Sequence, residues 1–216
     1  MRIQPQVDRT GAGPTSPRQR FAEGPRACYP AKRPARANER AAWAKGQGRE
    51  GAGRDLYILD QERAADWWEV EALFDLSFAP GRTALSSYRL REDVPPVAQL
   101  CRVARAEDGG QVGGAIRYWP VQVGGTDALL LGPIAVHPTA QGEGLGGALI
   151  RDSLERARPI CPRILLVGDA PYYSRFGFAR ATGVEMPPPT NPDRVLQLAL
   201  TDGAWDGVAG TVTRAA

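Results

Sequence analysis

The chain's hydrophobic and polar positions show no regular period until residue 56. Leu56–Leu59 is then a short apolar run, which predicts a first strand. Residues 1–55 are rich in Gly, Pro, Ala and Arg and carry twelve basic against five acidic side chains, a net charge of +7. A segment of this kind buries too little apolar surface to offset its ordering entropy. We therefore expect residues 1–55 to be a disordered basic tail, and a folded domain over residues 56–212.

A helix is expected after this first strand. Asp60 lies where it can cap the helix start, and Trp67, Val70 and Phe74 recur at helical spacing. The helix is expected to fade near Pro80-Gly81, where proline and glycine disfavour continuation. Its large aromatic side chains are expected in the core: Trp67, Trp68 and Phe78. Residues 82–97 are expected to form a loop with one helical turn.

The middle of the chain alternates strand patterns with tight turns. Three strands are expected at Gln99–Ala104, Val112–Val121 and Ala128–Val136, with turns at 107–110 and 124–127. Gly132-Pro133 interrupts the third of these strands. Proline cannot donate to a sheet ladder and glycine weakens a strand interior, so this pair predicts a bulge or a local parting of strands.

The C-terminal third continues the alternation of helix and strand. The expected elements are a helix that starts within Gln141–Gly147 and stops before Pro159, a buried strand Arg163–Gly168, a short helix from Asp169-Ala170-Pro171 to Gly177, and strands at Leu196–Leu200 and Val208–Val212. Gly147, Ile150, Leu154 and Ala157 are expected on one face of the longer helix. The order of elements predicts a mixed α/β sheet in a single domain.

Composition excludes several classes of protein. A chain of 216 residues can bury one ordinary core, and no apolar run approaches the length of a membrane span. No secretory signal is visible, so a cytoplasmic setting is expected. Cys28, Cys101 and Cys161 are far apart and form no CxxC pair, which argues against a disulfide framework and a metal site. No motif supports nucleic-acid binding by the tail. The sequence leaves open whether the chain forms a homodimer.

The segment Leu131–Gly147 is the most informative for function, because a buried strand runs into a glycine-rich turn and then a helix. Glycines allow close backbone approach, and the free N–H groups of a helix start favour phosphate. A phosphate-bearing ligand is therefore expected. A nucleotide P-loop would need Lys and Ser/Thr after the last glycine, but Ala148 and Leu149 stand there.

A dinucleotide fingerprint is the competing interpretation of the same glycines. GxGxxG fits at Gly142, Gly144 and Gly147, and Asp169 follows about 20 residues later. Against it, His137–Gln141 separate the strand from the fingerprint, and too few residues follow Asp169 for the rest of such a domain. The dinucleotide interpretation remains an alternative at this point.

The motifs around these glycines resemble those of the GNAT acetyltransferase superfamily. Gln141-x-x-Gly144-x-Gly146 is similar to the family's cofactor motif, and Val136-x-Pro138 to its strand exit. Tyr172–Phe178 resembles the family's Tyr-x-x-x-Gly-Phe segment. The full pattern looks most like the YhbS-like branch of predicted acyltransferases, and the resemblance covers about Leu56–Val212.

The resemblance implies a GNAT fold that binds acetyl-CoA as cosubstrate. In this fold a bulge splays two neighbouring strands, which would explain Gly132-Pro133, and the pantetheine arm lies in the opening. The strand residues implied to pair with pantetheine are Ile134, Ala135 and Val136. The residues implied to cradle the pyrophosphate through their backbone amides are Gln141, Gly142, Gly144, Leu145, Gly146 and Gly147.

The resemblance also implies direct attack of a primary amine on the thioester, with Tyr173 as the general acid. A phenol has a pKa of about 10 and stays protonated, so it can donate to a thiolate. Tyr172 is the packing alternative. The base is unassigned, because Leu129–Val136 has no acidic residue; bound water and His137 are the candidates.

The acceptor, a small-molecule or peptide amine, is not identified by the sequence. By the resemblance, the end of the first helix and the loop through Tyr88 would shape its pocket. A non-catalytic domain that binds or senses acyl-CoA is the alternative from a different class. This alternative rests on the absence of an acidic residue from the strand Leu129–Val136.

Overall fold

A mixed sheet is the centre of the structure, a computed structural model that describes residues 41–43, 57–78, 80–107 and 109–215. The strands are β1 (Ala41–Trp43), β2 (Tyr57–Gln61), β3 (Arg102–Ala106), β4 (Val112–Val123), β5 (Thr126–Val136), β6 (Arg163–Val167), β7 (Ala179–Arg180), β8 (Val184–Glu185), β9 (Val195–Ala199) and β10 (Gly210–Arg214). The expected α/β fold with a mixed sheet is confirmed, since β5 and β6 are parallel while most other pairs are antiparallel.

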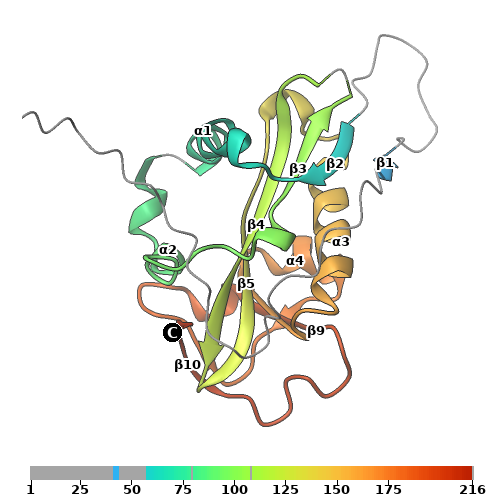
Figure 1. Cartoon of the computed structure of the whole chain (residues 1–216). Helices are drawn as coiled ribbons and strands as arrows, with labels where there is room; N and C mark the ends of the chain where they lie inside the picture. The colour runs from blue at the N-terminus through green and yellow to red at the C-terminus, as the bar shows by residue number, and fades with distance from the viewer. Residues whose placement is uncertain (1–40, 44–56, 79, 108, 216) are drawn as a thin grey trace, which may run out of the picture.

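The helices lie on both faces of this sheet. The α-helices are α1 (Trp67–Phe78), α2 (Ser86–Arg89), α3 (Leu145–Ala157) and α4 (Ala170–Tyr173). Short 3-10 turns are η1 (Ala64–Asp66), η2 (Pro80–Ala84), η3 (Ala98–Leu100), η4 (Pro138–Ala140), η5 (Ser174–Phe176) and η6 (Pro192–Arg194). Figure 1 shows α1 and α2 on one side of the long strands β4 and β5, and α3 and α4 on the other.

The long β4–β5 hairpin holds the two halves of the sheet together. Its two-residue turn is Gly124-Gly125, both with positive φ, and Val123 pairs with Thr126. The sheet order runs β1-β2-β3-β4-β5-β6-β9-β7, and β10 pairs with the far end of β4. The expected turn and both strands of the hairpin are present, with β4 ending and β5 beginning two residues closer to the turn than expected.

Three apolar clusters lie against the sheet in the described residues, and two of them lie under the long helices α1 and α3. The larger lies under α3, where Leu149, Ile150 and Leu154 pack on β4, β5 and β6. The smaller lies under α1, where Val70, Leu73 and Phe74 are all but fully buried. The predicted face of α3 is confirmed, because its members Gly147, Ile150, Leu154 and Ala157 are all buried.

The aromatic side chains of α1 correct one expectation. Trp67, Trp68 and Phe78 are 41%, 78% and 43% exposed, so they do not belong to the core. The buried stripe of α1 is narrow and consists of three residues near its middle, while these aromatics lie at the two ends of the helix. The spacing of apolar residues predicted the helix correctly, but the aromatic side chains at its two ends were wrongly expected to be buried.

The start of α1 corrects a second expectation. Asp60 lies inside β2, where its carboxylate accepts from the Gln61 amide at 2.8 Å, and it does not cap a helix. The helical segment begins with η1, where the Asp66 carboxylate accepts from the Arg63 amide at 2.9 Å. Strand β2 therefore extends through the position that sequence assigned to the helix cap.

Three smaller boundaries differ from the expectation. Residues 98–100 form a 3-10 turn, so the strand expected at Gln99–Ala104 is β3 and begins at Arg102. Strand β10 runs to Arg214, past residue 212. Ala41–Trp43, within the expected tail, pairs antiparallel with β2. The prediction of disorder for residues 1–40 and 44–55 lies outside the described residues.

Neither a membrane span nor a metal cluster is found in the part of the chain that the structure describes. No helix there has both the length and the apolar run needed to cross a bilayer. No group of three His, Cys, Asp or Glu side chains there is arranged to hold a metal ion.

Candidate active site

Strands β5 and β6 part in the middle of the sheet. They pair only at Leu129–Ile164 and Leu130–Leu165, after which β5 continues beyond β6. At this point the β4–β5 register shifts, so that Gly132 and Pro133 together face the single residue Arg117. Gly132 has a φ of +120°. The bulge predicted from Gly132-Pro133 is therefore present, and it lies where the two strands separate.

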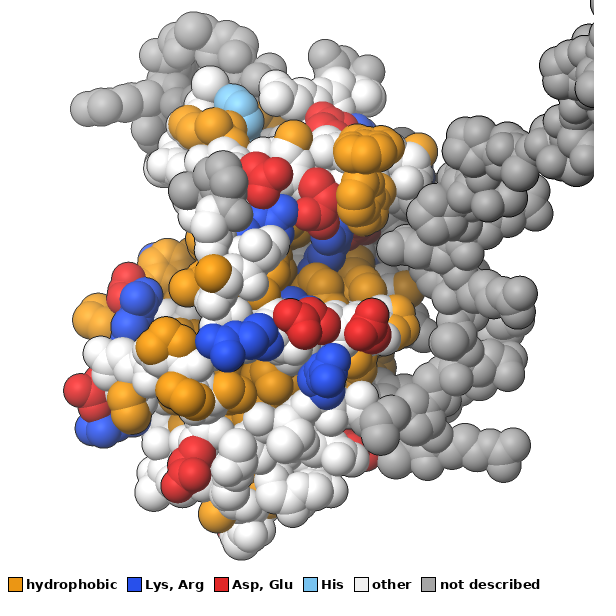
Figure 2. Space-filling view, turned by 90° about the vertical axis from the view of Figure 1, so that its left-hand side faces the viewer, with side chains coloured by type: hydrophobic (Ala, Val, Ile, Leu, Met, Phe, Trp, Pro, Cys, Tyr) orange, Lys and Arg blue, Asp and Glu red, His pale blue; other side chains and the backbone are white. Residues whose placement is uncertain are grey.

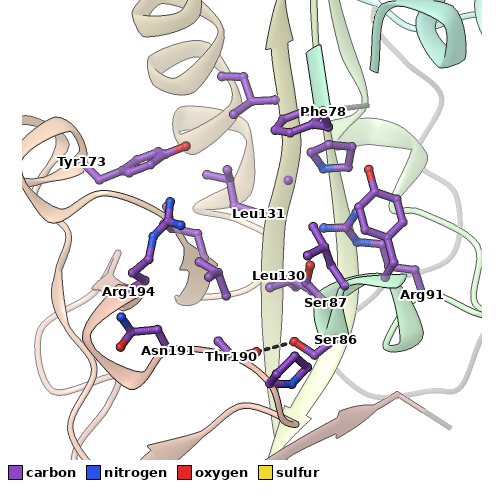
Figure 3. Close-up of a pocket in the computed structure, with 18 residues that line it drawn as sticks. Phe78, Ser86, Ser87, Arg91, Leu130, Leu131, Tyr173, Thr190, Asn191 and Arg194 are labelled. Atoms are coloured by element: carbon purple, nitrogen blue, oxygen red, sulfur yellow. Dashed lines mark hydrogen bonds between the residues drawn. The ribbon is translucent and has the colours of Figure 1, made fainter. Parts of the chain in front are cut away.

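A cavity of about 410 Å³ opens where the strands part. Its walls come from the bulge of β5, the end of β6, the segment from α1 to α2, and the loop before β9 (Figure 3). The lining residues are Phe78, Leu85, Ser86, Ser87, Tyr88, Arg91, Leu130, Leu131, Gly132, Pro133, Ile134, Leu166, Val167, Tyr173, Pro189, Thr190, Asn191 and Arg194. Segments that are far apart in sequence thus meet around the bulge.

The two adjacent tyrosines of α4 lie in different places. Tyr173 lines the cavity, and Figure 3 shows its hydroxyl directed towards β5. Tyr172 does not line the cavity, and its hydroxyl lies 3.2 Å from where a Cβ on Gly146 would stand. Of the two, only Tyr173 can reach a group bound where the strands part.

The environment of Tyr173 keeps its hydroxyl protonated. Burial, with smaller contributions from the nearby Tyr172 and Asp169, raises the pKa of Tyr173 to about 12. Within the described residues, its hydroxyl has no hydrogen-bond partner in the protein. The proton of Tyr173 is therefore held at neutral pH and free to be donated to a ligand.

The glycine-rich loop ends at the start of α3, as the sequence predicted. Gly142 and Gly144 have φ angles of +77° and +81°, which favour glycine. A Cβ added at either residue would meet no atom within 4 Å, so the space over the loop is open. The first helical bond of α3 runs from the Ala148 amide to the Gly144 carbonyl at 3.0 Å.

The amides of Leu145, Gly146 and Gly147 precede that first bond and have no acceptor within the helix. Such a helix start binds phosphate through its free N–H groups and its dipole. Gln141 stands just before the loop, and its side-chain amide donates to the Val136 carbonyl at 3.1 Å. This bond ties the loop to the end of β5.

One edge of β5 after the bulge is available to a ligand. Ile134, Ala135 and Val136 pair with β4 on one side, opposite Ile116, Ala115 and Gly114. On the other side, no strand of the described residues pairs with them. Of these three residues Ile134 lines the cavity, and Val136 leads towards the glycine loop. The edge thus runs from the cavity to the loop.

His137 is held away from the cavity. Its Nδ1 atom lies 2.7 Å from the Thr139 hydroxyl and accepts from the Thr139 amide at the start of η4. His137 is not among the described residues that line the cavity, and its side chain caps η4.

The wall opposite β6 is held by a network of charged side chains. Arg82 binds Glu71 at 2.6 Å and Asp75 at 2.8 Å, and it donates to the Tyr88 hydroxyl at 2.9 Å. Figure 2 shows acidic and basic side chains interleaved across this face of the molecule. The network fixes Tyr88, and residues from the end of α1 through α2 line the cavity.

Several cavity residues were not found by sequence reasoning. Ser86 and Thr190 lie 104 residues apart and share a hydrogen bond across the cavity mouth (Figure 3). Arg91 and Asn191 come from irregular segments and Arg194 from the short turn η6, and all three line the cavity. No local pattern marks these positions, because only the fold brings the segments together.

Comparison with known proteins gives one family. Residues 99–180 match the acetyltransferase (GNAT) domain. The chain is 35% identical over 132 residues to the uncharacterized N-acetyltransferase YjhQ of Escherichia coli K12, covering 59% of this chain and 71% of YjhQ. It is 33% identical over 150 residues to the uncharacterized N-acetyltransferase YhbS of the same strain, covering 66% of this chain and 87% of YhbS.

Two solved structures share the fold. A crystal structure of Escherichia coli YhbS in complex with CoA matches with a TM-score of 0.65 and 28% identity, over 77% of this chain and 93% of that one. A GNAT family acetyltransferase from Brucella melitensis in complex with acetyl-CoA matches with a TM-score of 0.55 and 29% identity, over 74% and 96%.

Proposed function

The chain belongs to the GNAT family of N-acetyltransferases, and from this premise we propose that it moves an acetyl group from acetyl-CoA to a primary amine by direct attack. The observation that carries the proposal is the parting of β5 from β6, with Tyr173 on one side and the open glycine loop beyond the strand end. The complexes of the two structural relatives with CoA and acetyl-CoA support the choice of cosubstrate.

The residues fit the parts of such a ligand. The amides at the start of α3, together with Gln141, Gly142 and Gly144, would hold the pyrophosphate. The free edge of Ile134–Val136 would pair with the pantetheine arm, as an added strand does. The thioester would then lie at the bulge, beside Gly132.

In the proposed reaction the amine nitrogen attacks the thioester carbonyl carbon, and the carbon–sulfur bond breaks. A backbone N–H of the parted strand would stabilise the oxyanion. The Tyr173 hydroxyl would give its proton to the leaving thiolate and regain one from solvent. No described residue that lines the cavity is Asp, Glu or His, so water would remove the proton of the ammonium.

Two measurements test this proposal. Calorimetric titration should show binding of acetyl-CoA and none of NAD; the reverse result would favour a dinucleotide site. A panel of primary amines should then give release of free CoA thiol that depends on the added amine. Tight binding of acetyl-CoA without thiol release by any amine would instead support a non-catalytic acyl-CoA-binding domain.

A further inference from the structure

Arg91 places a positive charge in the wall of the cavity. Its guanidinium carbon lies 4.2 Å from the Tyr88 ring centroid and 4.8 Å from that of Trp119. Its Nη2 atom lies 3.7 Å from where a Cβ on Gly132 would stand. Figure 3 shows the side chain reaching towards β5. The two aromatic rings hold the guanidinium in place beside the bulge.

Among the described residues, no carboxylate forms an ion pair with this charge. The Nε and Nη1 atoms of Arg91 are buried and have no hydrogen-bond partner there. Burial lowers the pKa of Arg91 to about 10, so the group remains protonated at neutral pH. A buried cation without a partner costs free energy, and such a cost commonly persists at a site that a ligand completes.

The other buried arginines differ in this respect. Arg82 is paired with Glu71 and Asp75. Arg117 and Arg102 are likewise paired with carboxylates, at distances of 2.5 to 2.7 Å. Among these buried arginines of the described residues, Arg91 is therefore the one without a carboxylate partner, and it lines the cavity.

The remaining charge of the cavity has the same sign. Arg194 lines the opposite wall (Figure 3) and pairs at 3.1 Å with Asp169, which does not line the cavity. None of the described lining residues is acidic. An acceptor with several positive charges would be repelled here, whereas an anionic group would be attracted.

From this arrangement we infer that the acceptor is a small amine that carries a carboxylate, of the amino-acid type, and that Arg91 binds the carboxylate. The inference rests on the proposed function. A volume of about 410 Å³ suits a small molecule. Arg91 lies beside the bulge where the thioester is proposed to sit. An acceptor that fits both must therefore carry its amine only a few bonds from its carboxylate.

The test compares each α-amino acid with its own carboxamide as acceptor, with thiol release as the readout. The wild type should use the acids at least tenfold better in kcat/KM, since a hydrogen bond to a charged group has this magnitude. Arg91→Gln should lose the preference mainly through KM. Arg89→Gln is the matched control: Arg89 is exposed, donates to the Pro188 carbonyl and does not line the cavity, so the preference should persist.

Amides accepted as well as acids by the wild type, or a preference that survives Arg91→Gln, would overturn the inference. Aminomethylphosphonate in place of glycine tests whether the anion is a phosphonate rather than a carboxylate; a better rate with the phosphonate also overturns it. Titration of N-acetylglycine and N-acetylglycinamide, with and without CoA, measures the same preference without turnover. If N-acetylglycine and N-acetylglycinamide bind equally well, or if neither binds, the result counts against the inference. Failure of acetyl-CoA to bind refutes only the proposed function.

Discussion

The rings of Tyr172 and Tyr173 meet edge to face, with centroids 4.9 Å apart and planes at 81°. Because the rings are nearly perpendicular, these two neighbouring side chains direct their hydroxyls to different places. The Tyr173 hydroxyl enters the cavity, whereas the Tyr172 hydroxyl approaches Gly146 at the start of α3. The pair therefore offers a matched test of which tyrosine acts on the reacting groups.

Tyr173→Phe should lower kcat by about 10²–10⁴-fold, the usual contribution of a general acid. Phenylalanine keeps the ring that packs near Phe178 and removes the only proton that Tyr173 can donate. Binding of acetyl-CoA should stay within a few-fold, and the melting temperature should change little. Steady-state thiol release and calorimetry measure the two effects separately.

Tyr172→Phe is the control for this change and should lower kcat far less. A small change in acetyl-CoA affinity is its expected effect, because its hydroxyl lies at the glycine loop. Full turnover by both variants would mean that Tyr173 only packs and that water protonates the thiolate. Impairment of Tyr172→Phe alone would move the acid to the other tyrosine.

Gly144→Ala should weaken acetyl-CoA binding by at least tenfold while the protein stays folded. The added methyl group enters the open space over the loop, where the pyrophosphate is proposed to lie. The φ of +81° makes alanine strained, at a cost of about 1–2 kcal/mol. Calorimetric titration with acetyl-CoA measures the affinity, and urea unfolding measures the strain.

Gly125→Ala is a control that separates the effect of backbone strain from that of a methyl group in the proposed pyrophosphate site. Gly125 has a φ of +83° and also has no atom within 4 Å of an added Cβ, but it lies at the tip of the β4–β5 hairpin. The two variants should lose similar stability, and Gly125→Ala should bind acetyl-CoA normally. Equal affinities in both variants would remove the loop from the proposed binding site.

Arg91→Met should raise the free energy of unfolding by about 1–2 kcal/mol, because it replaces a buried cation without a carboxylate partner by an apolar side chain. The sign follows from the pKa. Since burial lowers the pKa of Arg91 to about 10, the folded state binds this proton less well than the unfolded state does, and at neutral pH the charge costs stability.

Arg117→Met is the opposite case and should lower the free energy of unfolding by about 3–5 kcal/mol. It removes a buried guanidinium that pairs with Glu62 and Glu71, so Glu62 loses its partner and Glu71 keeps only Arg82. Urea unfolding at pH 7 gives both values. If both variants were destabilised alike, Arg91 would be a structural residue like Arg117.

Stability should fall as the pH rises above 9. Burial, with a smaller contribution from Glu62, raises the pKa of the Cys101 thiol from 9.0 to about 12. Between these values the unfolded state releases a proton that the folded state keeps, which favours unfolding by up to about 1.4 kcal/mol per pH unit. Below pH 9 both states keep the proton and this contribution is constant.

Cys101→Ala removes the titrating thiol and should reduce this slope between pH 9 and 10. Its absolute stability will be lower, because the side chain is 5% exposed and its loss leaves a cavity. The relevant quantity is therefore the difference between urea midpoints at pH 8 and pH 10. Identical slopes in the two proteins would show that the thiol does not contribute.

Local chemistry was enough to predict the elements that carry the proposed cofactor site. The glycines before α3 require positive φ angles, and Gly132-Pro133 disrupts a strand ladder, so both features follow from the residues themselves. The β4–β5 hairpin and the buried face of α3 follow from periodicity and turn residues in the same way. These are properties of short segments, and sequence encodes them directly.

The acceptor side of the cavity was decided only by the tertiary structure. Arg91 is one of many arginines in the sequence, and nothing local separates it from Arg82 or Arg89. Its significance comes from what surrounds it: two rings, the bulge of β5 and the absence of a carboxylate partner for its buried Nε and Nη1. For the two tyrosines of α4, the resemblance favoured Tyr173, but only packing decides where each hydroxyl points. Burial and pairing depend on residues far apart in the chain, so periodicity and spacing cannot determine them.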